Sequence, residues 1–166
     1  WMDYLERKGL LDPGSRRRLL GNRLVWIVPS ARPPAADALS HLGRDGRLAL
    51  ADPRHVPAGK YAKAALERLG VWPGVEKRVA AAENVRAALA LVARGEAPLG
   101  VVYETDARAE SRVRIAARID SGLHPPIVYP AAAVRGAGAS AQQYLGFLAG
   151  QQAGAIFEKH GFDVGR

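Results

Sequence analysis

The chain has 166 residues and carries 24 lysine and arginine against 16 aspartate and glutamate residues, which gives a formal net charge of +8. Its 48% hydrophobic and 24% charged residues are typical of a globular protein and exclude a disordered tail or a collagen-like repeat. The sequence contains no cysteine, which excludes a disulfide framework, a thiolate metal site and a cysteine nucleophile. A basic protein of this kind binds polyanions, one small anion or neither.

The first part of the chain combines helix and strand patterns. Residues Trp1–Gly9 show the apolar face of a helix that ends at the glycine. Ser15 is a candidate cap for a short helix over Arg16–Leu20. Leu24–Val28 is a continuous β-prone run, which is typical of a buried strand. A second short helix is predicted over Asp37–Leu42.

Three strands and two helices are predicted in the middle of the chain. The strands are Leu48–Leu50, the minor strand Val79–Ala81 and Leu99–Tyr103. One helix follows the loop of residues 52–59, which is rich in proline and glycine. The other begins near Val85, from which apolar residues recur at i, i+3, i+4 and i+7.

The last part of the chain contributes two more strands and one long helix. Val113–Ile119 alternates between apolar and polar residues, which indicates a half-exposed strand, and Ile127–Val134 is a second strand. Gly136–Ser140 is expected to be flexible, and Ala141–Lys159 is expected to form one helix loosened by two glycines. Strands that alternate with helices predict an α/β fold with a largely parallel sheet.

Three residues follow predicted strands at places where open α/β sheets bind ligands. Ala58 and Val85 lie in the first turns of their helices, where backbone N–H groups have no intrahelical acceptor. Tyr103 ends a strand, and its hydroxyl can donate a hydrogen bond at the same sheet edge. Gly59 permits a close approach of the backbone. The alternatives are ordinary loop-to-helix junctions and a core tyrosine whose hydroxyl is already satisfied.

A set of segments spread over nearly the whole chain is specific when its members occur together. They are LLGN at 19–22, DPRHVPAGKYA at 52–62, AENVRAALALV at 82–92, GEAPLGVVY at 95–103, TDA at 105–107, HPPIVYP at 124–130 and IFEKHGF at 156–162. In these segments the chain resembles the periplasmic molybdate-binding proteins of ABC transporters, the ModA family.

The resemblance implies a three-layer αβα sandwich of the periplasmic binding protein type II kind, with the second lobe complete and the first lobe partial. It implies that the backbone N–H groups of Ala58 and Val85 and the hydroxyl of Tyr103 bind a tetrahedral oxyanion, molybdate or tungstate, without a charged partner. The expected partner is the membrane permease of an ABC transporter, and the expected location is the bacterial periplasm. The resemblance implies no cofactor, no cation ligand and no catalysis.

The resemblance also predicts the organisation of the chain. Residues 1–22 are expected to be a fragment of the first lobe, 23–136 the second α/β lobe, and 137–166 a helical segment that returns to the first lobe. Hinges are expected near Asn22–Leu24 and Val134–Gly138. The family begins with a region that carries two serine loops, and nothing in this chain matches that region. We therefore expect the chain alone to bind the anion weakly or not at all.

A second hypothesis is an effector-sensing or nucleic-acid-binding module of a regulatory protein, because the same two-lobe fold serves in transcription regulators. The basic charge and the run Arg16–Arg18 support it, but no recognition helix accompanies that run, so a solvated face and no nucleic-acid partner are predicted. The four histidines lack metal-ligand spacing and are interpreted as surface or loop residues. Glu104 and Asp106 are expected to point in opposite directions from an extended chain, which excludes a pair of catalytic acids.

Overall fold

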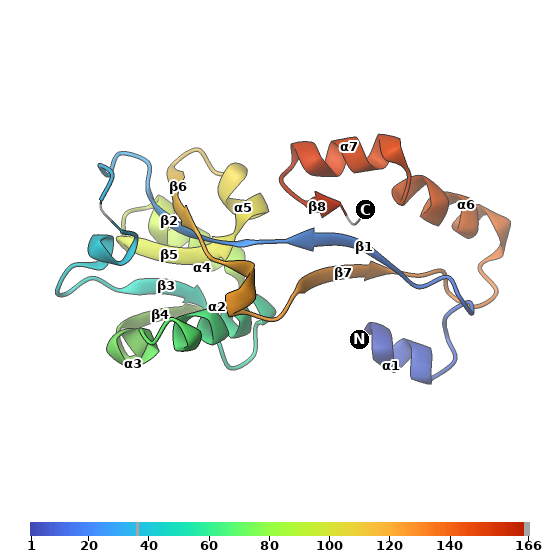
Figure 1. Cartoon of the computed structure of the whole chain (residues 1–166), viewed down its shortest axis with the longest axis horizontal. Helices are drawn as coiled ribbons and strands as arrows, with labels where there is room; N and C mark the ends of the chain where they lie inside the picture. Colours follow the sequence, from blue (N-terminus) through green and yellow to red (C-terminus); the bar gives the residue numbers. More distant parts are fainter. Residues whose placement is uncertain (36, 165–166) are drawn as a thin grey trace. The chain divides into compact units, whose positions relative to one another are not determined.

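The computed structural model describes residues 1–35 and 37–164, which divide into two compact units (Figure 1). Unit 1 consists of Trp1–Asn22 and Ile127–Arg166, and unit 2 of Arg23–Pro126. Unit 2 ends at residue 126, rather than at 136 as expected from the sequence, because the segment that follows pairs with a strand of unit 1. The second expected hinge, Val134–Gly138, accordingly lies inside unit 1.

Unit 2 is built on a five-stranded sheet with the order β4-β3-β5-β2-β6. Its strands are β2 (Leu24–Pro29), β3 (Leu48–Ala51), β4 (Val79–Ala82), β5 (Leu99–Tyr103) and β6 (Val113–Arg118). The three predicted strands β2, β3 and β5 share this sheet, as expected. The expectation of a mainly parallel sheet holds except at β2: β3 runs parallel to β4 and β5, whereas β2 runs antiparallel to β5 and β6, so β6 points the same way as β5. No strand–helix–strand crossover joins β2 to β5, so nothing requires that pair to be parallel.

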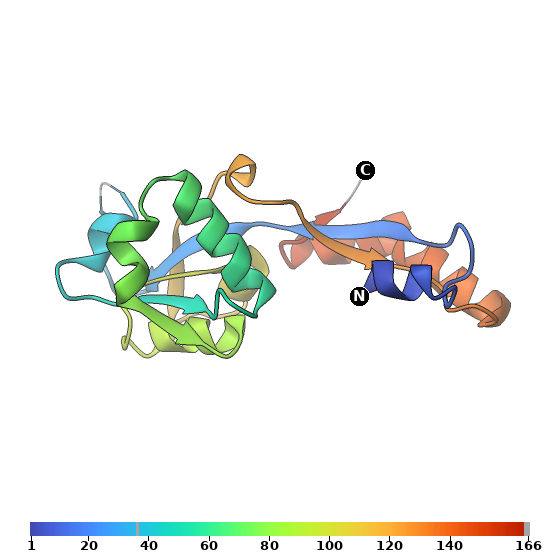
Figure 2. The same ribbon diagram turned by 90° about the horizontal axis from the view of Figure 1, so that it is seen from below.

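Helices cover both faces of the unit 2 sheet and give it three αβα layers, as predicted. The helix α2 (Pro57–Arg68) follows β3 and α4 (Val85–Ala93) follows β4, and the two lie on opposite faces (Figure 2). The connection β3–α2–β4 leads to one side of β3, and the connection β4–α4–β5 leads back to its other side. Because both crossovers are right-handed, their helices lie on opposite faces of the sheet. The shorter helical segments of unit 2 are η1 (Leu39–Leu42), α3 (Trp72–Val75), η2 (Glu76–Arg78), α5 (Glu104–Arg108) and η3 (Ser121–Leu123).

The core of unit 2 lies between α4 and the middle of the sheet. The helical spacing predicted from Val85 is confirmed, because the later members of that pattern, Ala88, Leu89 and Val92, are buried. They pack in one cluster with apolar side chains of β2, β3 and β5, namely Val25, Ile27, Ala49 and Val102. This packing fixes the start of α4 relative to the ends of the strands.

Unit 1 contains a three-stranded antiparallel sheet with the order β7-β1-β8. Its strands are β1 (Arg17–Asn22), β7 (Ile127–Ala131) and β8 (Asp163–Val164), and its helices are α1 (Met2–Arg7), α6 (Gly138–Leu148) and α7 (Gln151–Lys159). The predicted first helix is confirmed, with Gly9 in the left-handed region at a φ of 65°. No helix in the part of the chain that the structure describes is long and apolar enough to cross a membrane.

Two helices predicted for unit 1 are wrong. Residues 17–20 of the predicted helix Arg16–Leu20 lie in β1, because their backbone pairs with β7 and β8. Ser15 caps no helix; its hydroxyl donates to the Asp12 carbonyl at 2.7 Å and accepts the N–H of Ala133 at 3.1 Å. The long helix predicted to end at residue 159 is divided into α6 and α7, because Gly150 is extended, with φ −83° and ψ 169°. The segment expected to be flexible already contains the start of α6.

Candidate functional site

The loop between β3 and α2 is held in place by hydrogen bonds of its first residue, Asp52. The Asp52 carboxylate accepts the backbone N–H of Arg54 at 2.9 Å and its guanidinium at 2.7 Å, and these bonds lower the pKa of Asp52 from 3.8 to about 2. The backbone N–H of Asp52 donates to the carbonyl of Ala82, at the end of β4, at 2.8 Å. The entrance to α2 is thereby tied to the neighbouring strand.

The first turn of α2 presents backbone donors that no side chain caps. Its N-cap, Val56, makes no side-chain hydrogen bond, and Pro57 occupies the first turn and has no N–H to contribute. The N–H groups of Ala58 and Gly59 follow, where a helix offers no intrahelical acceptor. Gly59 fulfils the close approach expected from the sequence, since a Cβ at this position would lie 2.1 Å from the Ala51 carbonyl oxygen.

The start of α4 is a capped helix end. Asn84 is extended, and its side chain accepts the backbone N–H of Ala87 at 2.9 Å. Val85 is the first helical residue and is half-buried. With the Asn84 side chain bonded to Ala87, the N–H of Val85 has no acceptor inside its own helix.

Tyr103 is the last residue of β5, where its backbone pairs with Leu24, and its side chain is half-buried. Because β3, β4 and β5 are parallel, their carboxyl ends meet at one edge of the unit 2 sheet (Figure 1). Ala58, Val85 and Tyr103 follow or end these three strands, and we refer to them as the candidate anion site. The convergence of their three donors on one ligand stays a prediction.

The buried carboxylate beside this site, Glu104, could not be predicted from the sequence. Glu104 was expected to lie in an extended chain, but it begins the helix α5, because the backbone turns directly after Tyr103. Its side chain is fully buried and accepts hydrogen bonds from Arg108 and Arg118, which lower its pKa from 4.5 to about 2. Alternating spacing cannot reveal such a cluster, since its members come from separate segments.

Asp106, the other acid of the expected pair, has a different environment. It is largely buried, which raises its pKa, while the guanidinium of Arg86 at 3.8 Å lowers it. It lines a cavity of about 310 Å³ with Leu89, Ala109 and Glu110, among other residues. The two acids thus have pKa values shifted in opposite directions, and Glu104 is bonded to arginines.

The histidines and the basic run give no further site. His41 is buried in η1, contrary to the expectation of a surface or loop position, whereas His124 lies in a loop as expected, although it is buried. No group of three or more histidine, aspartate and glutamate side chains suited to a metal ion occurs among residues 1–35 and 37–164. Arg16 forms ion pairs with acids of α1, and Arg17 and Arg18 are exposed on β1, as expected of a solvated face.

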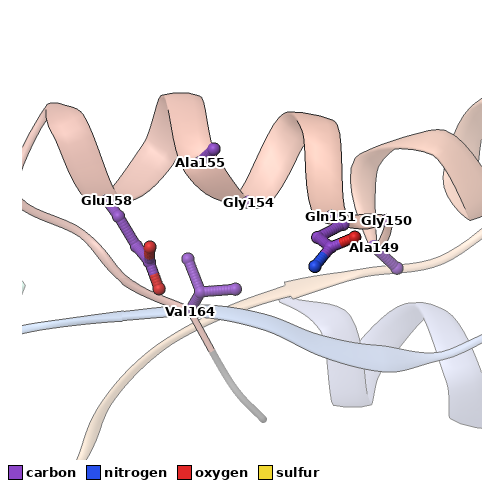
Figure 3. A pocket seen from close by; sticks show the side chains of 7 residues that line it. All are labelled: Ala149, Gly150, Gln151, Gly154, Ala155, Glu158 and Val164. Atoms are coloured by element: carbon purple, nitrogen blue, oxygen red, sulfur yellow. The ribbon is translucent and has the colours of Figure 1, made fainter.

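A separate cavity of about 500 Å³ lies in unit 1. Its lining consists mostly of small residues of α7 and the preceding turn, and Figure 3 shows Gln151 and Glu158 extending from α7 on the side of Val164. None of the predicted site residues lines this cavity.

Nearly the whole chain matches one protein family. A family model described as bacterial extracellular solute-binding protein matches residues 1–163. The chain belongs to this family.

Two curated relatives of this solute-binding protein are named molybdate-binding protein ModA. The relative from Escherichia coli strain K12 is 43% identical over 171 residues, which cover 99% of this chain and 66% of the relative. The relative from Haemophilus influenzae is 38% identical over 174 residues, which cover 99% of this chain and 67% of the relative. This solute-binding protein therefore spans about two thirds of the length of these relatives.

Solved structures show the same fold. A substrate-binding domain from Clostridium difficile superposes with a TM-score of 0.87 at 26% identity, covering 99% of this solute-binding protein and 73% of that chain. The periplasmic molybdate-binding protein of Azotobacter vinelandii has a TM-score of 0.77 at 24% identity, and the match covers 99% of this solute-binding protein and 74% of that chain. The periplasmic binding protein fold expected from the sequence is thus confirmed.

Proposed function

We propose that this solute-binding protein captures a tetrahedral oxyanion, molybdate or tungstate, for an ABC transporter. The names of its two curated relatives support molybdate as the ligand. The observation that carries the proposal is the meeting of β3, β4 and β5 at one sheet edge, which brings the starts of α2 and α4 and the residue Tyr103 to that edge. The ligand-binding residues that we propose are Ala58, Val85 and Tyr103.

The proposed donors are neutral, which suits a dianion that must be distinguished from other anions. Backbone N–H groups at Ala58 and Val85 bind oxygen atoms with fixed directions, and the dipoles of α2 and α4 add positive potential at the same place. The Tyr103 hydroxyl adds a third donor. A basic side chain would hold sulfate or phosphate with less dependence on their geometry, since a point charge imposes little direction.

The proposed role is transport without covalent chemistry. We infer that the loaded protein delivers the anion to a membrane permease and works in the bacterial periplasm without a cofactor. Membership of a family of extracellular solute-binding proteins supports this role. Neither relative is named as a regulator or as a nucleic-acid-binding protein.

Titration calorimetry with molybdate, tungstate, sulfate and phosphate tests the proposal. Because the chain spans about two thirds of the length of its relatives, the titration compares the 166-residue chain with the complete product of its gene. We expect the complete product to bind molybdate and tungstate tightly and the other two anions weakly, and the 166-residue chain to bind them weakly. Failure of the complete product to bind either anion would contradict the assignment. Binding to DNA that weakens steeply with salt would favour the regulatory alternative.

A further inference from the structure

Glu104 is a fully buried carboxylate that follows Tyr103 directly in the chain. Its Oε1 atom accepts hydrogen bonds from Arg108 Nη2 at 2.6 Å and Arg118 Nη2 at 2.9 Å, and its Oε2 atom accepts one from Arg118 Nε at 3.1 Å. Arg23 Nη1 lies 3.9 Å from Oε2. A buried carboxylate is stable only with partners of this kind, because an unpaired charge in the interior has a high desolvation cost.

The three arginines belong to three different segments around the end of β5. Arg108 is in α5, Arg118 ends β6, and Arg23 stands immediately before β2. The backbone reinforces the same junction, since the N–H of Glu104 donates to the Arg23 carbonyl at 2.9 Å. One carboxylate therefore joins α5 to the ends of β2 and β6, next to the β5 terminus.

Tyr103 lies within this bonded junction. Its backbone pairs with Leu24 on β2, and its carbonyl leads into α5 through Glu104. The direction in which its side chain leaves the sheet edge thus depends on the relative placement of β2, β5 and α5. The ion pairs of the Glu104 carboxylate with Arg23, Arg108 and Arg118 link these segments.

We propose that Glu104 is a positioning residue, which holds the Tyr103 hydroxyl in the place where it binds the oxyanion. This inference rests on the proposed function. Replacement by glutamine keeps the size of the side chain but supplies one acceptor oxygen and an amide N–H₂ that faces guanidinium donors. The arginines then lose part of their bonding, and α5 is free to shift together with the residue before it.

A double-mutant cycle on the complete gene product tests the inference with molybdate as the probe. Calorimetry gives the Kd of the unchanged protein and of its E104Q, Y103F and E104Q/Y103F variants. We expect E104Q to weaken binding about tenfold when Tyr103 is present and less than twofold when phenylalanine replaces it. A purely structural role would lower the Tm of E104Q but would not make its effect on Kd depend on the Tyr103 hydroxyl.

E110Q is the matched control, because Glu110 is also bonded to an arginine, Arg112, at 2.7 Å but does not adjoin Tyr103. We expect E110Q to leave the Kd unchanged. If E104Q does not fold, R118Q replaces it in the cycle, since this variant removes one exposed guanidinium and leaves Arg108 on the buried carboxylate.

Each outcome of the cycle has a defined meaning. An equal loss of affinity in the tyrosine and phenylalanine backgrounds overturns the positioning role, and so does an unchanged Kd in E104Q. Absence of molybdate binding by the unchanged protein overturns the proposed function and this inference with it. If the unchanged protein binds molybdate but the effects of E104Q and Y103F on the Kd are independent, the inference is overturned and the proposed function is not.

Discussion

Gly59 brings the first turn of α2 into direct contact with the end of β3. A Cβ at this position would lie 2.1 Å from the Ala51 carbonyl oxygen and 2.8 Å from the Asp52 carbonyl carbon, so backbone atoms and not a flexible side chain oppose it. An alanine usually stabilises a helix relative to glycine, by about 0.5–1 kcal/mol. At this position the contact reverses that preference.

We predict that Gly59→Ala lowers the free energy of unfolding by about 1–3 kcal/mol, as expected of overpacking against rigid atoms. The displaced first turn also moves the N–H of Ala58, so molybdate affinity falls as well. Urea unfolding and calorimetry measure the two effects. Gly146→Ala in α6 is the control, because open space surrounds that position, and it should be neutral or stabilising. Equal changes in the free energy of unfolding for Gly59→Ala and Gly146→Ala would contradict the close contact between Gly59 and the Ala51 carbonyl.

Tyr103 offers a substitution that removes one hydroxyl and keeps the ring. We predict that Tyr103→Phe weakens molybdate binding by about 1–3 kcal/mol, because a desolvated dianion loses a donor that water does not replace. The Tm of the free protein should change little, since the ring and its packing remain. Calorimetry on the complete gene product measures the affinity. Unchanged affinity would remove Tyr103 from the proposed ligand set.

At the scale of elements, the N-cap of α4 connects stability with anion binding. The Asn84 side chain accepts the N–H of Ala87, and Val85 of the candidate anion site follows it directly. A substitution at residue 84 can therefore change the cap, the charge next to the site, or both.

We predict opposite effects for two substitutions of Asn84. Asn84→Ala removes the cap and costs about 1 kcal/mol of stability. Asn84→Asp keeps an acceptor and places a favourable negative charge at the helix start, so stability is retained or rises, while repulsion weakens molybdate binding roughly tenfold. Urea unfolding and calorimetry on both variants measure these changes. An aspartate variant with unchanged affinity would place the anion away from the start of α4.

The elements that could be predicted from the sequence are those whose signals are local. The start of α4 follows from Asn84 and from the apolar spacing that begins at Val85. β1 could not be predicted, because its partners β7 and β8 lie at the other end of the chain and their pairing outweighs local preference. The division of the last helix depends on the extended backbone at Gly150, a conformation that a glycine permits but does not require.

At the scale of the whole molecule, the sequence was enough to predict that the three residues of the candidate anion site follow strands that end at one sheet edge. The contacts that hold those strand ends in place could not be predicted. A rule for parallel strands suffices to bring the residues after β3, β4 and β5 to one edge. The antiparallel β2 and the bonding of Glu104 to Arg23, Arg108 and Arg118 depend on contacts between segments far apart in the sequence. Sequence patterns report which residues are polar, but not which of them meet.

The same carboxylate makes the stability of the fold depend on pH. The pKa of Glu104 is about 2 in the folded protein, against an ordinary value of 4.5, because Arg118 and Arg108 bond its ionised form. A lowered pKa means that the stabilising contribution is complete above the ordinary value and is lost as the pH falls toward 2. Asp52 and Glu110, held by arginines at exposed positions, also have pKa values of about 2. Their contributions are smaller, because solvent screens exposed pairs.

We therefore predict that the unchanged protein loses stability between about pH 5 and pH 2, and that Glu104→Gln loses less over the same range, because glutamine has no proton to gain. At pH 7 the variant is the less stable protein, and the difference between the two narrows as the pH falls through the range in which Glu104 is protonated in the unfolded chain. Urea unfolding at several pH values measures the difference. Glu110→Gln, whose carboxylate has a similar pKa in an exposed pair, should show a weaker narrowing. A difference in stability between the unchanged protein and Glu104→Gln that stays constant from pH 7 to pH 2 would contradict a pKa lowered by Arg118 and Arg108.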